Sequence, residues 1–201
     1  MSNVDSVKVV HQLMDQFNQA DNQLTVGGFK LNQIGALLDK TVFYAYDRAV
    51  ISAQVQRFRE LIPKRIKLHY AIKANPYWPV IQHLRGLVDG FDVASQKEML
   101  LALQAGMPVA DISFAGPGKT DAELRSAISA GVTLNVESAT ELKRIVQIGQ
   151  QLQAVPQVAL RINPAFELKA SGMKMAGGAK PFGIDEEQVF ELLSQIGAME
   201  V

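Results

Sequence analysis

The chain has 201 residues, 48% of them hydrophobic, and its 20 basic and 20 acidic side chains balance. A chain of this size can bury a sizeable core in one or two domains, and without a basic block it lacks the electrostatic footprint of a nucleic-acid or anionic-membrane binder. No apolar run spans a membrane, the histidines lack metal-ligand spacing, and the absence of cysteine fits a reducing compartment. We expect a cytoplasmic globular protein without a metal.

The first 40 residues differ from the rest of the chain. Ser6–Gln19 has apolar side chains at helical spacing and predicts an amphipathic helix. Leu24–Leu31 contains Gly27-Gly28 and predicts a short strand with a turn, and Asn32–Leu38 predicts a brief helix. We assign residues 1–40 to a lead-in segment and residues 41–201 to a domain of repeating elements.

From residue 41 onward, short apolar runs alternate with helical patterns. The expected strands are Val42–Tyr46, Ile66–Ile72, Phe91–Ala94, Ile112–Ala115, Val132–Val136 and Val158–Ile162. The expected helices are Arg48–Leu61, Trp78–Arg85, Gln96–Ala105, Thr120–Ala130, Ala139–Leu152 and Asp185–Ile196. Thr120 and Glu123 form a capping box, and Ser138 is the expected N-cap of the next helix. Repeated strand–helix units imply parallel strands with right-handed crossovers, in an open doubly wound sheet or a (β/α)8 barrel.

The two faces of the expected strands differ in character, which separates these two architectures. One face is apolar, as at Ile112, Phe114 and Leu134, whereas the other carries small or polar residues such as Ser113 and Asn135. An open sheet covered by helices on both sides is apolar on both faces. The pattern therefore favours a barrel with helices outside and a polar interior, and the expected fold class is α/β, a (β/α)8 TIM barrel.

The number of units falls short of a closed barrel. About six strand–helix units are visible, whereas an eight-stranded barrel needs eight, and the chain ends after Val201, where another strand is expected. We expect either a truncated piece of a longer protein or a barrel that closes with a partner, and we favour the first.

The stretch KLHYAIKANP (67–76) is the most suggestive of chemistry. With strand periodicity, Lys73 shares a face with His69 and lies at the strand's C-terminal end, before the strand-stopping pair Asn75-Pro76. The carboxyl ends of parallel strands are where α/β folds place their active sites. Lys73 is thus a candidate catalytic residue, although charged residues also commonly close strands.

Four further charges are candidates for the same interior. Asp92 lies near the end of the next strand, where a buried carboxylate needs a cationic partner, and Lys73 is the candidate. Arg161 points inward, and an arginine there usually binds an anion or a planar oxygen acceptor. Glu98 and Glu137 are candidates to orient Arg161 or Lys73. Each of these charges is also compatible with a purely structural role.

Two loops complete the set of motifs. SFAGPGKT (113–120) invites comparison with a phosphate-binding loop, but that motif needs glycine five residues before Gly118, where this chain has Ser113, so we reject nucleotide hydrolysis. Asn163–Gly183 is long and rich in glycine, lysine and methionine, which is consistent with an active-site lid or with a solvated surface loop.

Seven stretches occur in an order that resembles a known family. They are TVFYAYD (41–47), YAIKANP (70–76), GFDVASQKE (90–98), FAGPGKTDAEL (114–124), NVESATEL (135–142), LRINP (160–164) and PFGID (181–185). From about Leu24 onward, the chain resembles the fold-type III pyridoxal-phosphate decarboxylases, the group of diaminopimelate and ornithine decarboxylases. Its loop before PFGID looks more like the branch associated with exosortase and exopolysaccharide gene clusters and with carrier-protein-linked amino-acid decarboxylation.

The resemblance implies a barrel of alanine-racemase type that binds pyridoxal 5'-phosphate and decarboxylates an amino acid, free or tethered to a carrier protein. Lys73 would form the internal Schiff base. Asp92 and Glu98 match acidic residues near that lysine and the cofactor, and Arg161 matches an arginine lining the pocket. The family also implies a homodimer with sites at the interface.

Other parts of the family's site lie on segments that we expect beyond this chain. The phosphate-binding loop, the glutamate at the pyridine nitrogen and a stacking histidine come from later strands, and a cysteine and a tyrosine come from a C-terminal β-domain. Residues 1–40 resemble the lead-in to that β-domain. We therefore expect this chain to bind the cofactor weakly and to show little or no turnover.

Three other functions stay open. An alanine racemase shares a lysine-containing KAN stretch, but it is expected to continue Ala-Tyr-Gly-His where this chain reads Asn75-Pro76-Tyr77-Trp78. A non-catalytic pyridoxal-phosphate carrier fits the chain length but fits GFDVAS and FAGPGKT poorly. The third is a binding barrel without any cofactor. The identity of the amino-acid substrate stays open as well.

Overall fold

The computed structural model describes residues 16–164 and 182–198. The chain divides into two compact units, Met1–Arg65 and Ile66–Val201. Most of the helix expected over Ser6–Gln19 and most of the loop expected over Asn163–Gly183 lie outside the described residues. No helix within the described ranges combines the length and the apolar character needed to cross a membrane.

The N-terminal unit contains a small antiparallel meander followed by two helices. Strands β1 (Gln19–Ala20), β2 (Gln23–Val26) and β3 (Phe29–Lys30) pair in that order. Between β2 and β3, Gly27 and Gly28 have φ of 58° and 84°, a conformation that glycine adopts without steric cost, so the turn expected there is confirmed. Helices α1 (Leu31–Leu38) and α2 (Arg48–Leu61) follow.

The first strand expected for the barrel is not present. Among the described residues, positions 42–46 form no strand. Val42 and Tyr44 are 88% and 91% exposed. An alternating pattern becomes a strand only where a neighbouring strand and a packing surface support it, and burial gives no such support here. The prediction for Val42–Tyr46 is therefore wrong.

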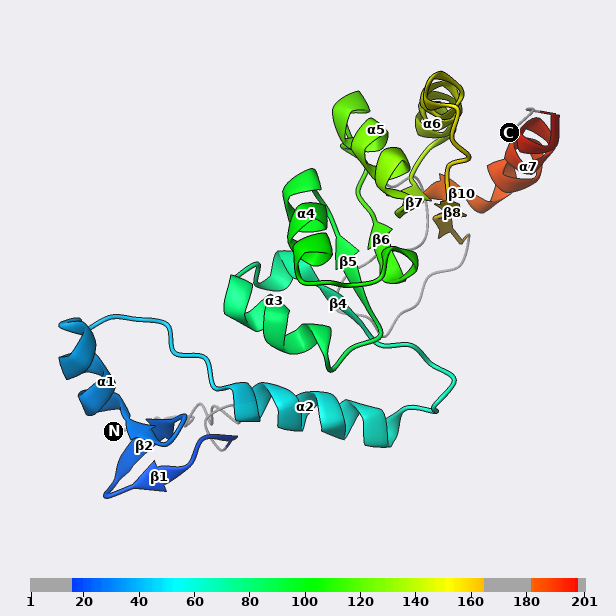
Figure 1. The fold of residues 1–201 in the computed structure, drawn as a ribbon. Helices are drawn as coiled ribbons and strands as arrows, with labels where there is room; N and C mark the ends of the chain where they lie inside the picture. The colour runs from blue at the N-terminus through cyan, green and yellow to red at the C-terminus, as the bar shows by residue number, and fades with distance from the viewer. Residues whose placement is uncertain (1–15, 165–181, 199–201) are drawn as a thin grey trace, which may run out of the picture. The chain divides into compact units, whose positions relative to one another are not determined.

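The second unit is built around a parallel sheet whose strands follow chain order (Figure 1). The strands are β4 (His69–Ala71), β5 (Gly90–Val93), β6 (Ile112–Phe114), β7 (Thr133–Val136) and β8 (Val158–Leu160). The helices between them are α3 (Trp78–Arg85), α4 (Gln96–Gln104), α5 (Asp121–Ala130) and α6 (Ala139–Leu152). A short strand β9 (Ile162–Asn163) pairs in parallel with β10 (Ile184–Asp185), which leads into α7 (Glu186–Ala198).

This arrangement confirms the strand–helix alternation expected from residue 66 onward. The ends of the elements differ from the expected ones by at most three residues. Helices α3 to α6 lie along one face of the sheet (Figure 1), as they do in the wall of a barrel and not in a doubly wound sheet.

The alternation along the strands gives the sheet an apolar face and a polar face. Phe91, Phe114 and Leu134 are 0% exposed and form the core under the helices. The residues next to them in the strands line a pocket on the opposite face. The expected difference between the faces is confirmed. It is weaker on β8, where Val158 is 40% exposed because this strand lies at an edge of the five-stranded sheet.

Candidate functional site

A pocket of about 710 Å³ opens at the carboxyl ends of the parallel strands, on the face of the sheet away from the helices. Its walls come from the strand ends and from the segments that follow them. The lining residues are Ala71, Lys73, Asp92, Val93, Ala94, Ser113, Ala115, Gly116, Pro117, Gly118, Lys119, Glu123, Asn135, Arg161 and Phe182. The pocket thus brings together Lys73, Asp92 and Arg161, three of the four residues that the family resemblance assigns to the site.

Lys73 lies in a 3₁₀ turn, Ile72–Ala74, that follows β4 directly. The backbone of this turn is fixed, because Ile72 is fully buried and its carbonyl accepts the N–H of Asn75 at 3.1 Å. The side chain of Lys73 is exposed and borders the pocket. Its amine is therefore accessible to a ligand from a well-anchored backbone.

Asp92 has other partners than the one expected. One carboxylate oxygen, Oδ1, accepts the Ser113 hydroxyl at 2.6 Å and contacts His69 Nδ1 at 3.1 Å. The strands pair Ala71 with Asp92, so His69, two residues earlier on the same face, lies beside the carboxylate. The expectation that Lys73 is the cationic partner of Asp92 is corrected for this reason.

Arg161 lies between β8 and β9 and is held by Glu137, which follows β7. Its Nη1 donates to both carboxylate oxygens of Glu137, at 3.1 and 3.2 Å. The side chain of Glu137 is 2% exposed and that of Arg161 is 30% exposed. The ring centroid of Phe182 lies 5.0 Å from the guanidinium carbon, within cation–π range. Of the two possibilities left open by the sequence, Glu137 orients Arg161 and not Lys73.

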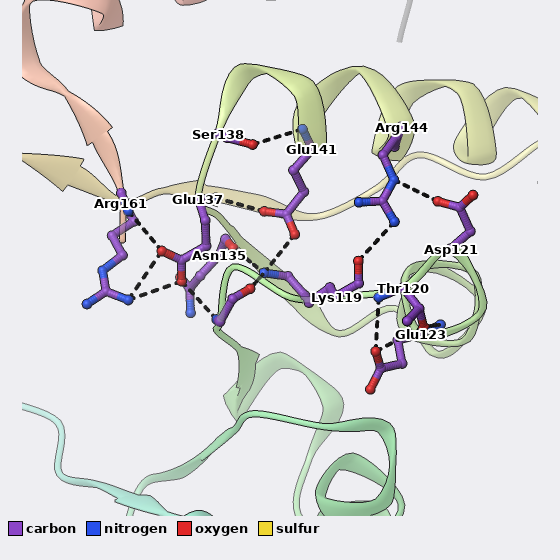
Figure 2. Close-up of polar contacts among 12 residues, drawn as sticks. Lys119, Thr120, Asp121, Glu123, Asn135, Glu137, Ser138, Glu141, Arg144 and Arg161 are labelled. Carbon is purple, nitrogen blue, oxygen red and sulfur yellow. Dashed lines mark hydrogen bonds and ion pairs between the residues drawn. The ribbon is translucent and has the colours of Figure 1, made fainter. Parts of the chain in front are cut away.

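Lys119 does not act as a phosphate-loop lysine would. Its side chain is 1% exposed, and its Nζ lies 3.0 Å from Glu141 Oε1 (Figure 2). The same nitrogen donates to the carbonyls of Gly116 at 2.6 Å and Asn135 at 2.9 Å. Because protein oxygens surround this ammonium group, it stabilises the loop after β6 and is not directed at a nucleotide.

Glu98, the fourth expected site residue, lies at the start of α4. Its Oε2 accepts the N–H of Ala94 at 2.8 Å, and its own N–H donates to the Ser95 hydroxyl at 3.2 Å. Glu98 is not among the lining residues of the pocket, whereas Ala94 is. Its carboxylate thus fixes a piece of the pocket wall through the backbone.

Glu123 fixes the starts of two helices. It accepts the N–H of Thr120 at 3.0 Å, in the expected capping box of α5, and the N–H of Gln96 at 3.2 Å, at the start of α4. The pKa of Glu123 is lowered from 4.5 chiefly by the Thr120 N–H, while burial raises it; the Gln96 N–H, the Thr120 hydroxyl and the charge of Lys119 lower it further.

Residues 48–200 match the family of pyridoxal-dependent decarboxylases, over its pyridoxal binding domain. The chain belongs to this family. The matched range contains Lys73 and every lining residue of the pocket. The family assignment made from the seven motifs is therefore confirmed.

Individual relatives agree with the family match. The chain is 35% identical over 170 residues to 2-[(L-alanin-3-ylcarbamoyl)methyl]-2-hydroxybutanedioate decarboxylase of Staphylococcus aureus, covering 84% of this chain and 42% of that protein. It is 31% identical over 162 residues to L-glutamyl-[BtrI acyl-carrier protein] decarboxylase of Niallia circulans, covering 80% and 38%. The chain spans less than half the length of these relatives.

The crystal structure of diaminopimelate decarboxylase from Helicobacter pylori, complexed with L-lysine, superposes with a TM-score of 0.73. The two chains are 31% identical, and the match covers 83% of this chain and 44% of that one. This likeness confirms the TIM-barrel class for the part of the barrel that the chain contains.

The pocket fits the pyridoxal cofactor that the family name implies. An accessible primary amine, the group that bonds to an aldehyde, borders a cavity whose volume lies in the usual range for small-molecule sites. Hydroxyl, amide, carboxylate and guanidinium groups stand in its walls. Within residues 16–164 and 182–198, no three His, Asp or Glu side chains gather closely enough to hold a metal ion.

The sequence places His69 on the strand face of Lys73 but does not link it to Gly90, yet the two residues lie together beside the site. They face each other in the register of β4 and β5. A Cβ at position 90 would lie 2.4 Å from His69 Cε1 and 2.4 Å from the carbonyl oxygen of Asp111, so glycine is required beside the imidazole. Only the strand register could have pointed to this pair, because their separation along the chain carries no motif.

Proposed function

We propose that the protein is a pyridoxal-phosphate-dependent decarboxylase acting on an amino acid, free or tethered to a carrier protein, with Lys73 as its catalytic residue. The observation that carries the proposal is the accessible amine of Lys73 at the rim of a polar pocket, in a chain of a pyridoxal-binding family. The substrate class rests on the relatives, since one is named for a carrier-protein substrate and another for diaminopimelate.

Lys73 would hold the cofactor through a C=N bond between its Nζ and the aldehyde carbon, formed as the aldehyde oxygen leaves as water, and its amine is a group at this rim that can hold or move a proton beside the substrate. When bound, pyridoxal phosphate supplies the electron sink that takes up the electron pair left by departing carbon dioxide. The fixed 3₁₀ turn under Lys73 keeps the amine in one region of the pocket.

Three further residues are assigned to cofactor binding in this proposal. Asp92 borders the pocket with its carboxylate oriented by His69 and Ser113. Arg161, which also lines the pocket, offers a guanidinium that can bind an anion. Glu98 acts indirectly, by holding the backbone of Ala94 at the pocket edge.

The test of the cofactor is an absorbance spectrum of the full-length protein with pyridoxal phosphate, before and after borohydride reduction, followed by peptide mapping. We expect a near-visible band that reduction locks onto Lys73. Lys73→Ala is expected to abolish the band. Lys67→Ala is the matched control, since Lys67 lies on the same stretch but pairs with Asp111 at 3.1 Å, and this variant is expected to keep it. No band, or a label on another lysine, contradicts the proposal.

The substrate is tested by carbon dioxide release from diamino and acidic amino acids, both free and carrier-tethered. Release by the full-length protein that requires Lys73 supports a decarboxylase, whereas a Lys73-linked band in that protein without release from any of these substrates contradicts the catalytic part. We further propose that the full-length protein is a homodimer, which the family resemblance supports, and that it is cytoplasmic, since the absence of cysteine fits a reducing compartment. A monomeric mass in light scattering of the cofactor-loaded full-length protein contradicts the dimer.

A further inference from the structure

Glu137 does not line the pocket itself but contacts two residues that do, Gly116 and Arg161. The side chain of Glu137 is 2% exposed, and a buried charge is costly unless it is paired and hydrogen-bonded. Oε1 accepts the N–H of Gly116 at 2.8 Å, and Oε2 accepts the N–H of Gly183 at 3.0 Å. Arg161 Nη1 donates to both oxygens (Figure 2). This set of partners satisfies the charge completely.

These partners come from three segments that are distant in sequence. Gly116 lies 21 positions from Glu137, Arg161 lies 24 away and Gly183 lies 46 away. Gly116 and Arg161 line the pocket, and so does Phe182, the neighbour of Gly183. One carboxylate therefore joins the loop after β6, the end of β8 and the approach to β10 into a single wall.

A second buried charge pair holds Glu137 from behind. The N–H of Glu137 donates to Glu141 Oε2 at 2.8 Å, and Glu141 Oε1 pairs with Lys119 at 3.0 Å. Lys119 in turn donates to the carbonyl of Gly116, whose N–H donates to Glu137. The contacts form a closed ring, so the carboxylate of Glu137 has little freedom to move.

Arg161 is restrained on its other side by the segment before β10. Gly183 has φ of 84°, and a Cβ there would lie 3.1 Å from the Arg161 carbonyl oxygen, so the backbone approaches closely. The N–H of Ile184 donates to the same carbonyl at 2.8 Å. The ring of Phe182 then lies over the guanidinium. Arg161 is held between Glu137 and Phe182 before any ligand binds.

We infer that Glu137 is a positioning residue for ligand binding: it holds Arg161 and the wall segments at Gly116 and Phe182–Gly183 in the arrangement that the ligand meets. A preformed wall avoids the entropy cost of ordering side chains and loops on binding. The inference rests on the proposed function only in taking pyridoxal phosphate as the probe.

The test is a double-mutant cycle on pyridoxal phosphate affinity. Glu137→Gln keeps the size of the side chain but removes the charge and one acceptor, and we expect affinity to fall about tenfold, the effect of one charge-assisted contact. In an Arg161→Met background, Glu137→Gln is expected to lower the affinity for pyridoxal phosphate less than about threefold, because Arg161, the main partner of Glu137, is absent. A full tenfold loss in that background, or no loss in either, overturns the inference.

A second readout needs no ligand. Amide hydrogen exchange at Gly116 and Gly183 is expected to accelerate at least about tenfold in Glu137→Gln. Glu123→Gln is the matched control: this carboxylate also accepts two backbone N–H groups but does not contact Arg161, so exchange at Gly183 is expected to stay unchanged. Unchanged exchange in Glu137→Gln overturns the inference. If Glu137→Gln does not fold, Glu137→Asp keeps the charge but shortens its reach, and the same acceleration at Gly183 is expected.

The two readouts separate this inference from the proposed function. Failure of the unaltered protein to bind pyridoxal phosphate contradicts the proposed function, while the exchange rates at Gly116 and Gly183 still decide the role of Glu137.

Discussion

The two faces of the parallel sheet are held in place by different forces. On the helix side, Phe91, Phe114 and Leu134 are 0% exposed and contribute apolar burial. On the pocket side, Asp92 and Ser113 belong to the same strands as Phe91 and Phe114 but are fixed by hydrogen bonds. The alternation of a β-strand places these two kinds of residue next to each other in sequence.

Within a single strand, stability and ligand binding therefore depend on different residues. Burial of an aromatic side chain contributes several kcal/mol, whereas a hydrogen bond exchanged for bonds to water contributes about 1 kcal/mol net. The helix-side face therefore holds the fold together. The pocket face mainly fixes the orientation of groups that a ligand meets, and changes there should affect affinity more than stability.

The neighbours Phe114 and Ser113 on β6 provide the largest contrast. Phe114→Ala is expected to lower the free energy of unfolding by about 3–5 kcal/mol, because it removes a fully buried ring and leaves a cavity. Ser113→Ala, the control on the opposite face, is expected to cost about 1 kcal/mol but to weaken pyridoxal phosphate binding, since Asp92 loses its 2.6 Å donor. Urea unfolding and ligand titration measure the two effects. Equal stability losses at the two positions would contradict the comparison.

The buried pair of Lys119 and Glu141 should be an exception to this division, because these polar side chains are buried and a change to them should affect stability. Their side chains are 1% and 5% exposed. Glu141→Gln leaves an uncompensated ammonium group and is expected to cost about 3 kcal/mol. The double variant Lys119→Met with Glu141→Leu leaves no unpaired charge. Its loss in the free energy of unfolding should therefore be smaller than the summed losses of Lys119→Met alone and Glu141→Leu alone. Strict additivity in urea unfolding contradicts this account.

Local features of the fold could be predicted from the sequence because they depend on near neighbours. The N-caps at Thr120 and Ser138 and the alternation of Ser113 with Phe114 involve residues a few positions apart. The place of Lys73 at the pocket could be predicted in the same way, since a strand end and the following Asn75-Pro76 mark its position. Pattern alone failed at Val42–Tyr46, where the periodicity is typical of a strand but Val42 and Tyr44 remain exposed.

The partners of the charged residues could not be predicted, because they depend on strand register and side-chain direction. His69 lies 23 positions from Asp92, and Gly183 lies 46 from Glu137. Glu141 shows the difficulty most clearly. It stands three residues after Ser138, as in a capping box, yet its carboxylate turns to Lys119 and to the N–H of Glu137. A local motif thus concealed a buried ion pair.

Glu123 is expected to give the smallest effect on stability, and that effect should depend on pH. Its pKa is lowered from 4.5, chiefly by the N–H of Thr120, so its stabilising contribution is complete above about pH 4.5 and is lost as the pH falls through the lowered value in the folded state. Glu123→Gln is expected to cost about 1 kcal/mol at neutral pH, because one acceptor and the charge are removed from two helix starts. The difference between the two proteins should shrink as unfolding is measured at progressively lower pH below 4.5, since protonation removes the same charge from the unaltered chain. A difference that stays constant with pH would mean that the lost contact, and not the ionised carboxylate, stabilises this edge of the pocket.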